Sequence, residues 1–460
     1  MTHSRGRAFM LTAALMGGAM ATPAWADGER IEDRLEELEL LLKEQQDQLR
    51  VLREEQQRLQ ATQVAAETAG KEAPKDEGAS ENAIEFGKTT VKFGGYIKLD
   101  VIASSFSDGE LPSSSLGRDF YIPSLIPVIP DAAGFEEGDD IDLDFNPRET
   151  RFLIDANTPF ENGVNLRGYF EIDFQVTNDG DERVSNTFPP RIRRGFIEVD
   201  GLTPGTWLVG QEWSTFHDVS VLPDGVDFIG PTEGTVFNRQ PMIRYSIGNW
   251  QLALEQPETA VTPFGGGARL LPGDDRVPDF AARYTFDGDW GYVRLQGILR
   301  ELRAENIGSL GDGTASTVGY GASLSGKMPV FDTGNVIRFM VTAGDGIGRY
   351  VGVNIINDVV DDGMGDLEAR GLFSGFFSYQ HFWSDQWRSN VTLSGFKAFD
   401  DTDLTGLTET RDVRSIRSSL IYSPVPKLDL GFEATWASRT IENGNSGELF
   451  RTQFAMKYKL

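Results

Sequence analysis

The feature that most limits the possible folds is a series of short segments in which apolar and polar residues alternate. In residues 450–460, Phe450 and Phe454 fall on one face, and Arg451 and Lys457 fall on the other. A period of two predicts a β-strand, because successive side chains leave a strand on opposite sides. One face suits lipid and the other suits water. One such segment decides little, but about sixteen in series predict an all-β transmembrane barrel of antiparallel strands.

The alternating segments come in pairs. Short stretches rich in Gly, Asp, Asn and Pro join the two members of a pair, which is turn chemistry. These turns are 158–163, 201–205, 248–249, 287–289, 332–335, 384–386 and 424–426. The longer connections are 106–146, 213–238, 257–278, 302–316, 345–368 and 400–412. Short turns on one rim and long loops on the other are typical of membrane barrels. We therefore predict a barrel over 89–460, with 106–146 as an extracellular loop.

The N-terminal part of the chain has a different character. Residues 1–26 predict a secretory signal peptide, with arginines before an apolar stretch and Ala24-Trp25-Ala26 as the cleavage site. Residues 30–62 repeat apolar side chains at alternating steps of four and three, which predicts an α-helical coiled coil between copies of the chain. A lone solvated helix is the alternative. Low hydrophobicity over 63–88 predicts a flexible linker.

Composition and motifs narrow the classes of function. A formal net charge of −27 argues against nucleic acid as a partner, and the absence of Cys excludes disulfides and thiolate metal sites. After the predicted signal peptide the histidines are His217 and His381, without a zinc-type cluster or a nucleophile motif. We therefore predict no metal, no cofactor and no catalysis. The acidic residues within 106–146 do not match the spacing of an EF-hand loop.

Many arginines fall on the face predicted to point into the barrel. A lipid-facing Arg at the membrane midplane costs ~2–4 kcal/mol, so these residues belong in a water-filled lumen. There the guanidinium groups attract carboxylates and phosphates and guide them through. The alternative is that each arginine pairs with an inward acid and only braces the wall. The predicted pore-lining residues are Arg151, Arg167, Arg239, Arg244, Arg283, Arg294, Arg338 and Arg417.

Residues 213–231, which follow the fifth predicted strand, are rich in apolar and aromatic side chains. This content favours a loop that folds into the barrel and narrows it, with its acids facing the arginines. An exposed loop at a subunit contact is the alternative. The residues of this predicted constriction are Trp213, Phe216, Asp218, Asp224, Asp227 and Phe228.

The same stretch carries a family resemblance. Trp213-Ser-Thr-Phe216, Asp227-Phe-Ile-Gly-Pro231 and residues 237–245 resemble DcaP-like porins of Gram-negative outer membranes, and so do residues 93–98. The resemblance implies a homotrimer of sixteen-stranded barrels with the coiled coil in the periplasm. It also implies passive diffusion of small hydrophilic solutes, preferably anions such as dicarboxylates.

The resemblance also bears on partners and on single residues. It implies contact with outer-membrane lipid and lipopolysaccharide, and a C-terminal strand that the barrel-assembly machinery recognises. Arg239 and Arg244 lie in the matched stretch but differ in parity, so Arg239 reaches the lumen only from the edge of the loop. The alternatives are a phosphate- or oxyanion-selective porin, a surface adhesion protein anchored by a barrel, and an outer-membrane enzyme.

Overall fold

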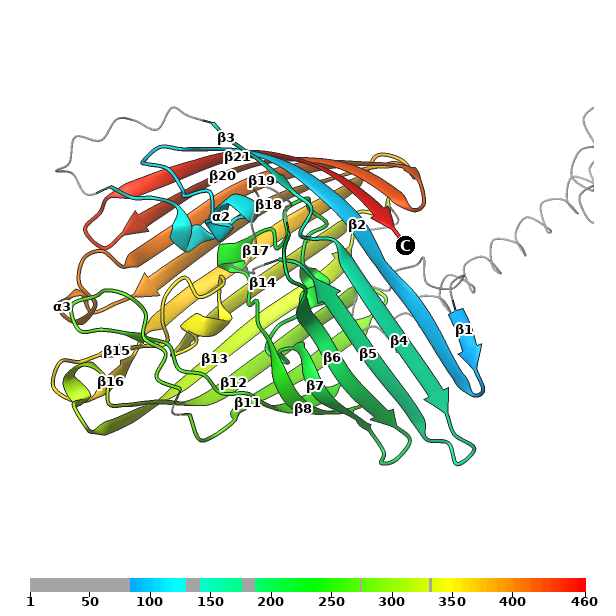
Figure 1. Ribbon diagram of the computed structural model, residues 1–460, viewed down its shortest axis with the longest axis horizontal. Helices are drawn as coiled ribbons and strands as arrows, with labels where there is room; N and C mark the ends of the chain where they lie inside the picture. Colours follow the sequence, from blue (N-terminus) through cyan, green and yellow to red (C-terminus); the bar gives the residue numbers. More distant parts are fainter. Residues whose placement is uncertain (1–82, 130–140, 176–186, 274, 331–332) are drawn as a thin grey trace, which may run out of the picture. The chain divides into compact units, whose positions relative to one another are not determined.

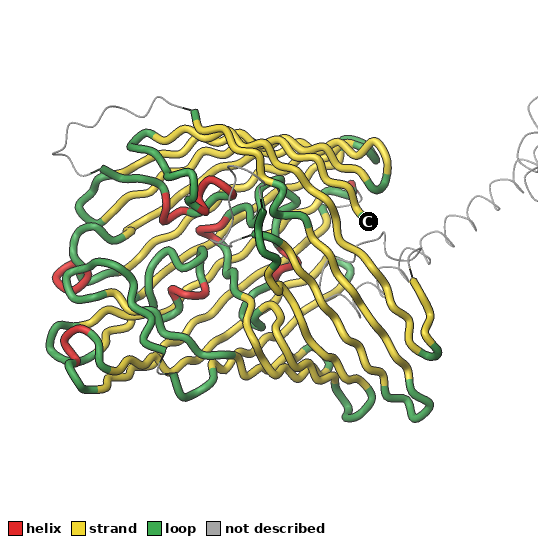
Figure 2. The backbone as a smooth tube through the Cα atoms, in the orientation of Figure 1, coloured by secondary structure: helices red, strands yellow, loops and turns green. Residues whose placement is uncertain are grey.

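The described part of the chain forms one closed antiparallel sheet. The computed structural model describes residues 83–129, 141–175, 187–273, 275–330 and 333–460. In these residues sixteen strands pair in chain order, and the last strand pairs with the first (Figures 1 and 2). The prediction of about sixteen antiparallel strands in a barrel is confirmed. The predicted signal peptide, the coiled coil and most of the linker lie outside the described residues.

The barrel strands follow the predicted hairpin order. They are β2 (Thr89–Phe106), β4 (Arg151–Pro159), β5 (Asn165–Asp173), β6 (Arg191–Asp200), β7 (Thr206–Trp213), β8 (Arg239–Ile247), β9 (Trp250–Glu255), β11 (Asp279–Gly288), β12 (Gly291–Glu305), β13 (Thr314–Pro329), β14 (Val336–Asp345), β17 (Gly371–Phe382), β18 (Trp387–Phe399), β19 (Thr410–Val425), β20 (Leu428–Ile441) and β21 (Ser446–Lys459). The barrel closes where β21 pairs with β2 in a register that runs from Tyr96↔Lys459 to Phe106↔Leu449.

Shorter elements extend or cover this sheet. The additional strands are β1 (Ala83–Phe86), β3 (Asp142–Asn146), β10 (Val261–Thr262), β15 (Val359–Asp361) and β16 (Leu367–Ala369), and the short α-helices are α2 (Leu116–Asp119) and α3 (Thr402–Thr405). Strand β1 forms a hairpin with β2, so strand pairing begins within the predicted linker, before the expected barrel boundary at 89. Strands β10, β15 and β16 form a separate small sheet in the long connections.

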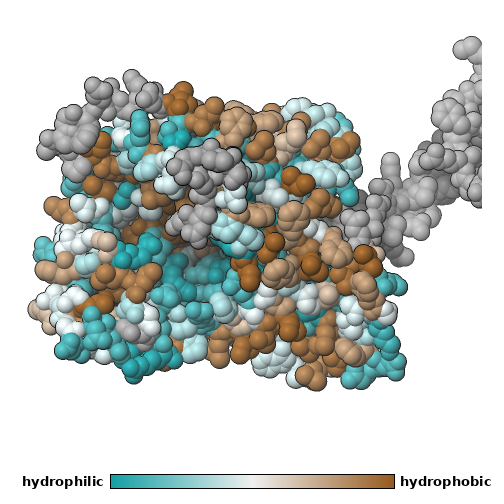
Figure 3. Space-filling model, in the orientation of Figure 1, coloured by the Kyte–Doolittle hydropathy of each residue, from teal (hydrophilic) through white to brown (hydrophobic). Residues whose placement is uncertain are grey.

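The two faces of the strands have opposite chemistry. In β21, Phe450 is 55% exposed and Arg451 is 2% exposed, and this alternation continues along the strand. In β5 the outward Phe170 is exposed, whereas the inward Glu171 is buried. Figure 3 shows apolar side chains over the strands in view and polar side chains at the turns and in the central hollow. The faces predicted from alternation are confirmed for both strands.

Aromatic side chains gather next to the short turns. Trp250 and Tyr284 flank neighbouring turns with ring centroids 4.7 Å apart, and Trp387 stacks on Tyr422 at 4.4 Å. Aromatic girdles of this kind mark the membrane–water interface of transmembrane barrels. The short-turn rim is therefore built to sit at a membrane surface.

The strands are shorter on one side of the barrel than on the other. We call the side with the short strands the low wall and the side with the long strands the high wall. The barrel strands from β4 to β9 have 6–10 residues, whereas those from β12 to β21 have 10–16. About 9–11 tilted residues cross a bilayer. The longer strands therefore extend past the membrane, and the inward-folded connections pack against them (Figure 1).

The segment 106–146, predicted as an extracellular loop, does not lie wholly at the rim, because part of it folds into the barrel. Tyr121 is fully enclosed and packs in one cluster with Ala437 of β20. Arg451 of β21 donates a hydrogen bond to the backbone of α2 at 2.5 Å. The reason is the apolar run at 120–126, which stays away from water by folding against the inner face of the wall.

Candidate functional site

The connection between β7 and β8, residues 214–238, folds into the barrel. We call it the inner loop; it contains most of the predicted constriction. The first arm of the loop follows β7, and the returning arm leads into β8. The two arms are joined near the wall, where Ser214 N donates to Asn238 O at 3.0 Å. Phe216 and Asp218 in its first arm have no exposed surface. The loop therefore lies within the barrel as a packed segment.

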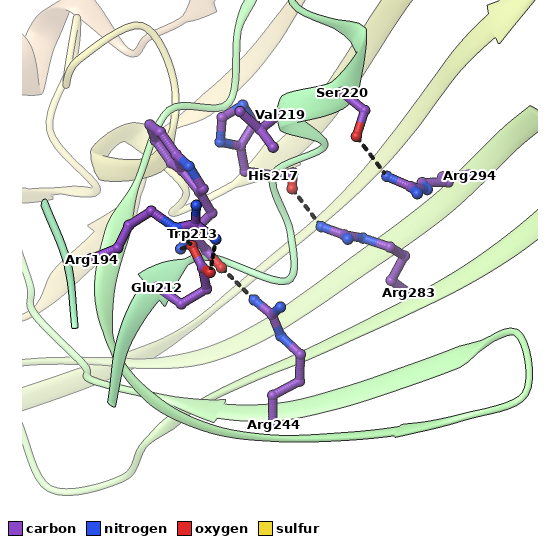
Figure 4. Close-up of a pocket in the computed structure, with 9 residues that line it drawn as sticks. All are labelled: Arg194, Glu212, Trp213, His217, Val219, Ser220, Arg244, Arg283 and Arg294. Carbon is purple, nitrogen blue, oxygen red and sulfur yellow. Dashed lines mark hydrogen bonds and ion pairs between the residues drawn. The ribbon is translucent and has the colours of Figure 1, made fainter. Parts of the chain in front are cut away.

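Arginines from three strands of the same part of the wall hold the first arm of the inner loop (Figure 4). Arg244 of β8 donates to Thr215 Oγ1 at 3.0 Å, and Arg283 of β11 donates to the Thr215 carbonyl at 3.0 Å. Arg294 of β12 forms an ion pair with Asp218 at 2.7 Å. The alternation of the strands turns all three side chains inward, and the loop supplies their acceptors. These arginines position the loop.

A hollow lies between these arginines and the first arm of the inner loop. Its empty volume, including the part open to solvent, is about 310 Å³. It is lined by Arg194, Glu212, Trp213, His217, Val219, Ser220, Arg244, Arg283 and Arg294. Four guanidinium groups and one carboxylate thus face the same space. Within the hollow, Arg194 pairs with Glu212 through a hydrogen bond of 2.7 Å. Positive charge dominates the lining.

Three acids of the inner loop, Asp218, Asp224 and Asp227, each face an arginine of the wall. Beyond the Asp218–Arg294 pair, Asp224 forms an ion pair with Arg388 of β18. Asp227 lies 3.9 Å from Arg417 of β19 and accepts a backbone hydrogen bond from Tyr121 at 3.1 Å. Arg417 also pairs with Glu433 at 3.3 Å. These contacts match the expectation that loop acids face the arginine side, and at Arg294 and Arg417 they match the bracing alternative.

Farther along, the inner loop reaches the seam where the barrel closes. Val226 N donates to Glu433 of β20 at 2.8 Å. The carbonyl of Val226 accepts hydrogen bonds from Lys98 of β2 at 2.7 Å and from Gln453 of β21 at 3.5 Å. One loop residue therefore contacts three adjacent strands, including the first and the last of the barrel.

Two predicted arginines on the low side of the wall pair with carboxylates. Arg167 donates two hydrogen bonds to Asp155, at 2.9 and 3.0 Å. Arg151 lies 3.7 Å from Glu171. Such pairs fix the side chains and offset the positive charge of the wall. Both residues face the lumen, and both follow the bracing alternative.

Arg239 and Arg338 differ from the other predicted arginines. Neither forms an ion pair with a residue of the described ranges. Arg239, at the very start of β8, stacks its guanidinium 4.7 Å from the Trp213 ring, so it reaches inward from the strand end as its parity requires. Nε and Nη1 of Arg338 on β14 are buried and have no hydrogen-bond partner among the described residues. These two residues carry positive charge without a carboxylate at ion-pair distance in the described ranges.

Comparisons with known proteins agree with this architecture. A model of the DcaP outer membrane protein family matches residues 30–460. The chain belongs to this family. No match to the chain was found among curated proteins.

Solved structures show the same barrel. The outer membrane channel DcaP of Acinetobacter baumannii has a crystal structure with a TM-score of 0.64 and 18% identity, over 82% of this chain and 100% of that chain. An anion-selective porin from Comamonas acidovorans has a TM-score of 0.50 and 8% identity, over 81% of this chain and 100% of that one. At these identities the likeness shows the fold. Family membership makes this DcaP-family barrel an outer-membrane one.

Several inward residues of this DcaP-family chain were not among the predicted site residues. Lys98 is buried and forms a charged contact with Glu149. Lys98 stands between the apolar residues Ile97 and Leu99, and this alternation predicts that its side chain points inward. The predicted long connection 345–368 does not lie wholly at the rim, because apolar residues of 346–358 are buried in a cluster with the wall. The isoleucines and valines of this connection are the sequence signal that could have predicted its burial.

The histidines of the DcaP-family barrel are placed as packing residues. His217 contacts the Trp213 ring edge-to-face at 4.8 Å, and within the described part of the chain its ring nitrogens have no hydrogen-bond partner. Asp218 turns away from it toward Arg294. His381 lies 4.2 Å from the Trp383 ring. Among the residues that the structure describes, no group of three or more His, Cys, Asp or Glu side chains could hold a metal ion.

Proposed function

We propose that this DcaP-family barrel is an outer-membrane porin for passive diffusion of small hydrophilic solutes, with a preference for anions such as dicarboxylates. The observation that carries the proposal is the lining of the hollow at the inner loop, with four arginines against one glutamate. Arg239 and Arg338 add positive charge without ion pairs in the described ranges. Positive charge in a narrow, low-dielectric passage attracts and concentrates anions.

Geometry supports carboxylates as the preferred anions. A guanidinium presents a planar fork of donors that matches both oxygens of a carboxylate. Because the four arginines of the hollow come from different strands and face one space, a solute with two carboxylates can contact two of them. The strongly negative net charge of the chain does not oppose this, since exposed acids on loops are screened from the lumen.

The remaining expectations form part of the same proposal. The coiled coil at 30–62 would hold three barrels together from the periplasm, and lipid and lipopolysaccharide would cover the apolar faces. The alternating C-terminal strand β21 would present the residues that the barrel-assembly machinery reads. Of the predicted pore-lining arginines, we assign the anion field to Arg239, Arg244, Arg283 and Arg338. We assign bracing to Arg151, Arg167, Arg294 and Arg417.

The proposal is tested by recording purified protein in planar bilayers across a salt gradient. We expect conductance steps with a reversal potential of anion-selective sign. Arg338→Gln should lower the anion preference, because it removes a cation that no close carboxylate offsets. Arg276→Gln is the matched control, since it removes the same charge from a side chain that is 66% exposed. Cation selectivity of the unchanged protein would contradict the anion preference, and folded protein without channels would contradict the porin.

A phosphate-selective porin is the second candidate, favoured by the buried Lys98 on the inner face. Block of the chloride current by succinate and by phosphate separates the two candidates. Stronger block by succinate at equal ionic strength supports the dicarboxylate preference, and stronger block by phosphate supports the second candidate.

A further inference from the structure

The long connection after β14 packs against the inner loop and is hydrogen-bonded to it. We call residues 346–358 the outer loop. Two backbone hydrogen bonds join it to the returning arm of the inner loop. Phe237 N donates to Tyr350 O at 2.8 Å, and Gly352 N donates to Thr235 O at 2.9 Å. Between them, the two loops form an antiparallel β-bridge.

The outer loop is also linked to the first arm of the inner loop, through two side chains of the wall. Gln240 of β8 donates to the Tyr350 hydroxyl at 2.7 Å and to Glu255 of β9 at 2.7 Å. The other carboxylate oxygen of Glu255 accepts a hydrogen bond from Thr215 N at 2.7 Å. Tyr350 and Thr215 are fully buried, and Glu255 is 1% exposed. This relay links the outer loop to the residue that Arg244 and Arg283 also bind.

The outer loop is itself fixed to the wall. Asp358 accepts hydrogen bonds from Arg300 at 2.8 Å and from Arg349 N at 2.9 Å. Asp279 of β11 accepts from Arg300 at 3.0 Å and from the Tyr350 hydroxyl at 2.7 Å. Arg300, Asp279 and Asp358 are fully enclosed. A buried and paired network of this kind has few alternative arrangements. The outer loop is therefore a firm support for the inner loop.

Apolar packing joins the two loops in one cluster. Phe216 and Val236 of the inner loop pack with Ile347, Tyr350 and Val351 of the outer loop. The same cluster includes inward side chains of β12 to β19. The inner loop is thus enclosed between the outer loop and the wall, and both of its arms are tied to Tyr350.

We propose that the outer loop is a clamp that sets the width of the passage, and that Glu255 is the positioning residue that links the clamp to the inner loop. This inference rests on the proposed channel function. Glu255 acts through Thr215, whose placement also sets where Arg244 and Arg283 stand. Loss of the Glu255 carboxylate leaves Thr215 N without its acceptor and breaks the link from Gln240 to the inner loop, so the first arm of the inner loop moves between more than one position.

Single-channel recording of Glu255→Ala tests this role. We expect brief conductance steps to become about tenfold more frequent, because a buried donor without its acceptor shifts such an equilibrium by roughly that factor. Tyr350→Phe, which removes only the hydroxyl, should act in the same direction and more weakly. Thr342→Val is the matched control: it loses a buried hydrogen bond of 2.9 Å to Ser323, between wall strands. It should behave like the unchanged protein. All variants are first shown to be folded by heat-dependent migration in gels.

A reversible crosslink gives a second, independent test. Val236 and Val351 are directly opposed in the antiparallel bridge, between the two backbone hydrogen bonds. Such a pair has Cα atoms about 4.5 Å apart, which a disulfide can span. The chain has no Cys, so Val236→Cys/Val351→Cys forms a single defined bond. In the Glu255→Ala background, oxidation should restore the low step frequency, and dithiothreitol should raise it again.

The outcomes separate the inference from the proposed function. If the unchanged protein conducts and folded Glu255→Ala has the same step frequency, the clamp is overturned and the porin stands. If oxidation of the cysteine pair leaves the steps unchanged, the coupling between the loops is overturned. If folded, unchanged protein forms no channel, the proposed function fails and the inference fails with it.

Discussion

The two sides of the barrel interior differ in what they contact. On the low wall, β4 to β6 carry charged pairs, in which Arg193 binds Glu171 at 2.6 Å and Asp173 at 2.5 Å. On the high wall, inward residues such as Met340 and Phe376 join an apolar cluster with the inner loop. The inward face is therefore charged on the low wall and apolar where the high wall meets the inner loop. We expect the charges of the low wall to set the sign of the electric field along the passage, and the apolar cluster to hold the passage in shape.

The largest effect is expected from the apolar side. Phe216→Ala should cost about 3–5 kcal/mol of packing energy, because it leaves a cavity under the inner loop. The passage should become wider and less uniform, measured as a higher exclusion size for neutral sugars. Phe170→Ala is the control, since it truncates an outward side chain that is 43% exposed. An unchanged exclusion size would show that the apolar cluster does not shape the passage.

Substitutions on the charged side should change the ion selectivity of the passage and leave its width unchanged. Glu171→Gln removes a carboxylate next to Arg193, so anion permeability relative to cation permeability should rise about twofold. Arg193→Gln should lower the ratio by a similar factor. Both are measured from the reversal potential in a salt gradient. Shifts in the same direction would mean that these residues do not act through their charge on the solute.

The difference between the two sides also predicts a dependence on salt. The Debye length falls from ~10 Å at 0.1 M to ~3 Å at 1 M ionic strength, so charges on the low wall act over shorter distances at high salt. Anion preference should decline with salt, while the exclusion size set by the apolar side stays constant. If both change together, the two sides do not have separate roles.

The smallest effect is expected from a pair on the low wall that carries no net charge. Arg167 and Asp155 are 30% and 25% exposed. Removing both in Arg167→Gln/Asp155→Asn should change the free energy of unfolding by less than about 1 kcal/mol, because exposed ion pairs contribute little. The reversal potential should also stay the same. A clear shift would place this pair in the path of the solute.

Alternation made the barrel predictable from the sequence. It located the sixteen strands, the faces of β5 and β21, and the inward direction of Arg244, Arg283 and Arg338, because side-chain direction depends only on neighbouring residues. It did not identify what those residues contact. Arg283 donates to loop carbonyls that no pattern marks, and the buried part of 106–146 was placed on the rim. Such contacts join residues far apart in sequence, and local periodicity carries no information about them.

The three hydrogen bonds at Val226 also bear on how the barrel closes. A seam between β21 and β2 that slipped by two residues would keep every side chain on its proper face. It would also move Lys98 relative to Gln453 by about 7 Å along the strands. The carbonyl of Val226 would then lose a donor in a buried site, at a cost of about 1–3 kcal/mol. The hydrogen bonds of the inner loop therefore stabilise the barrel in which β21 and β2 pair in the correct register over one in which the register has slipped.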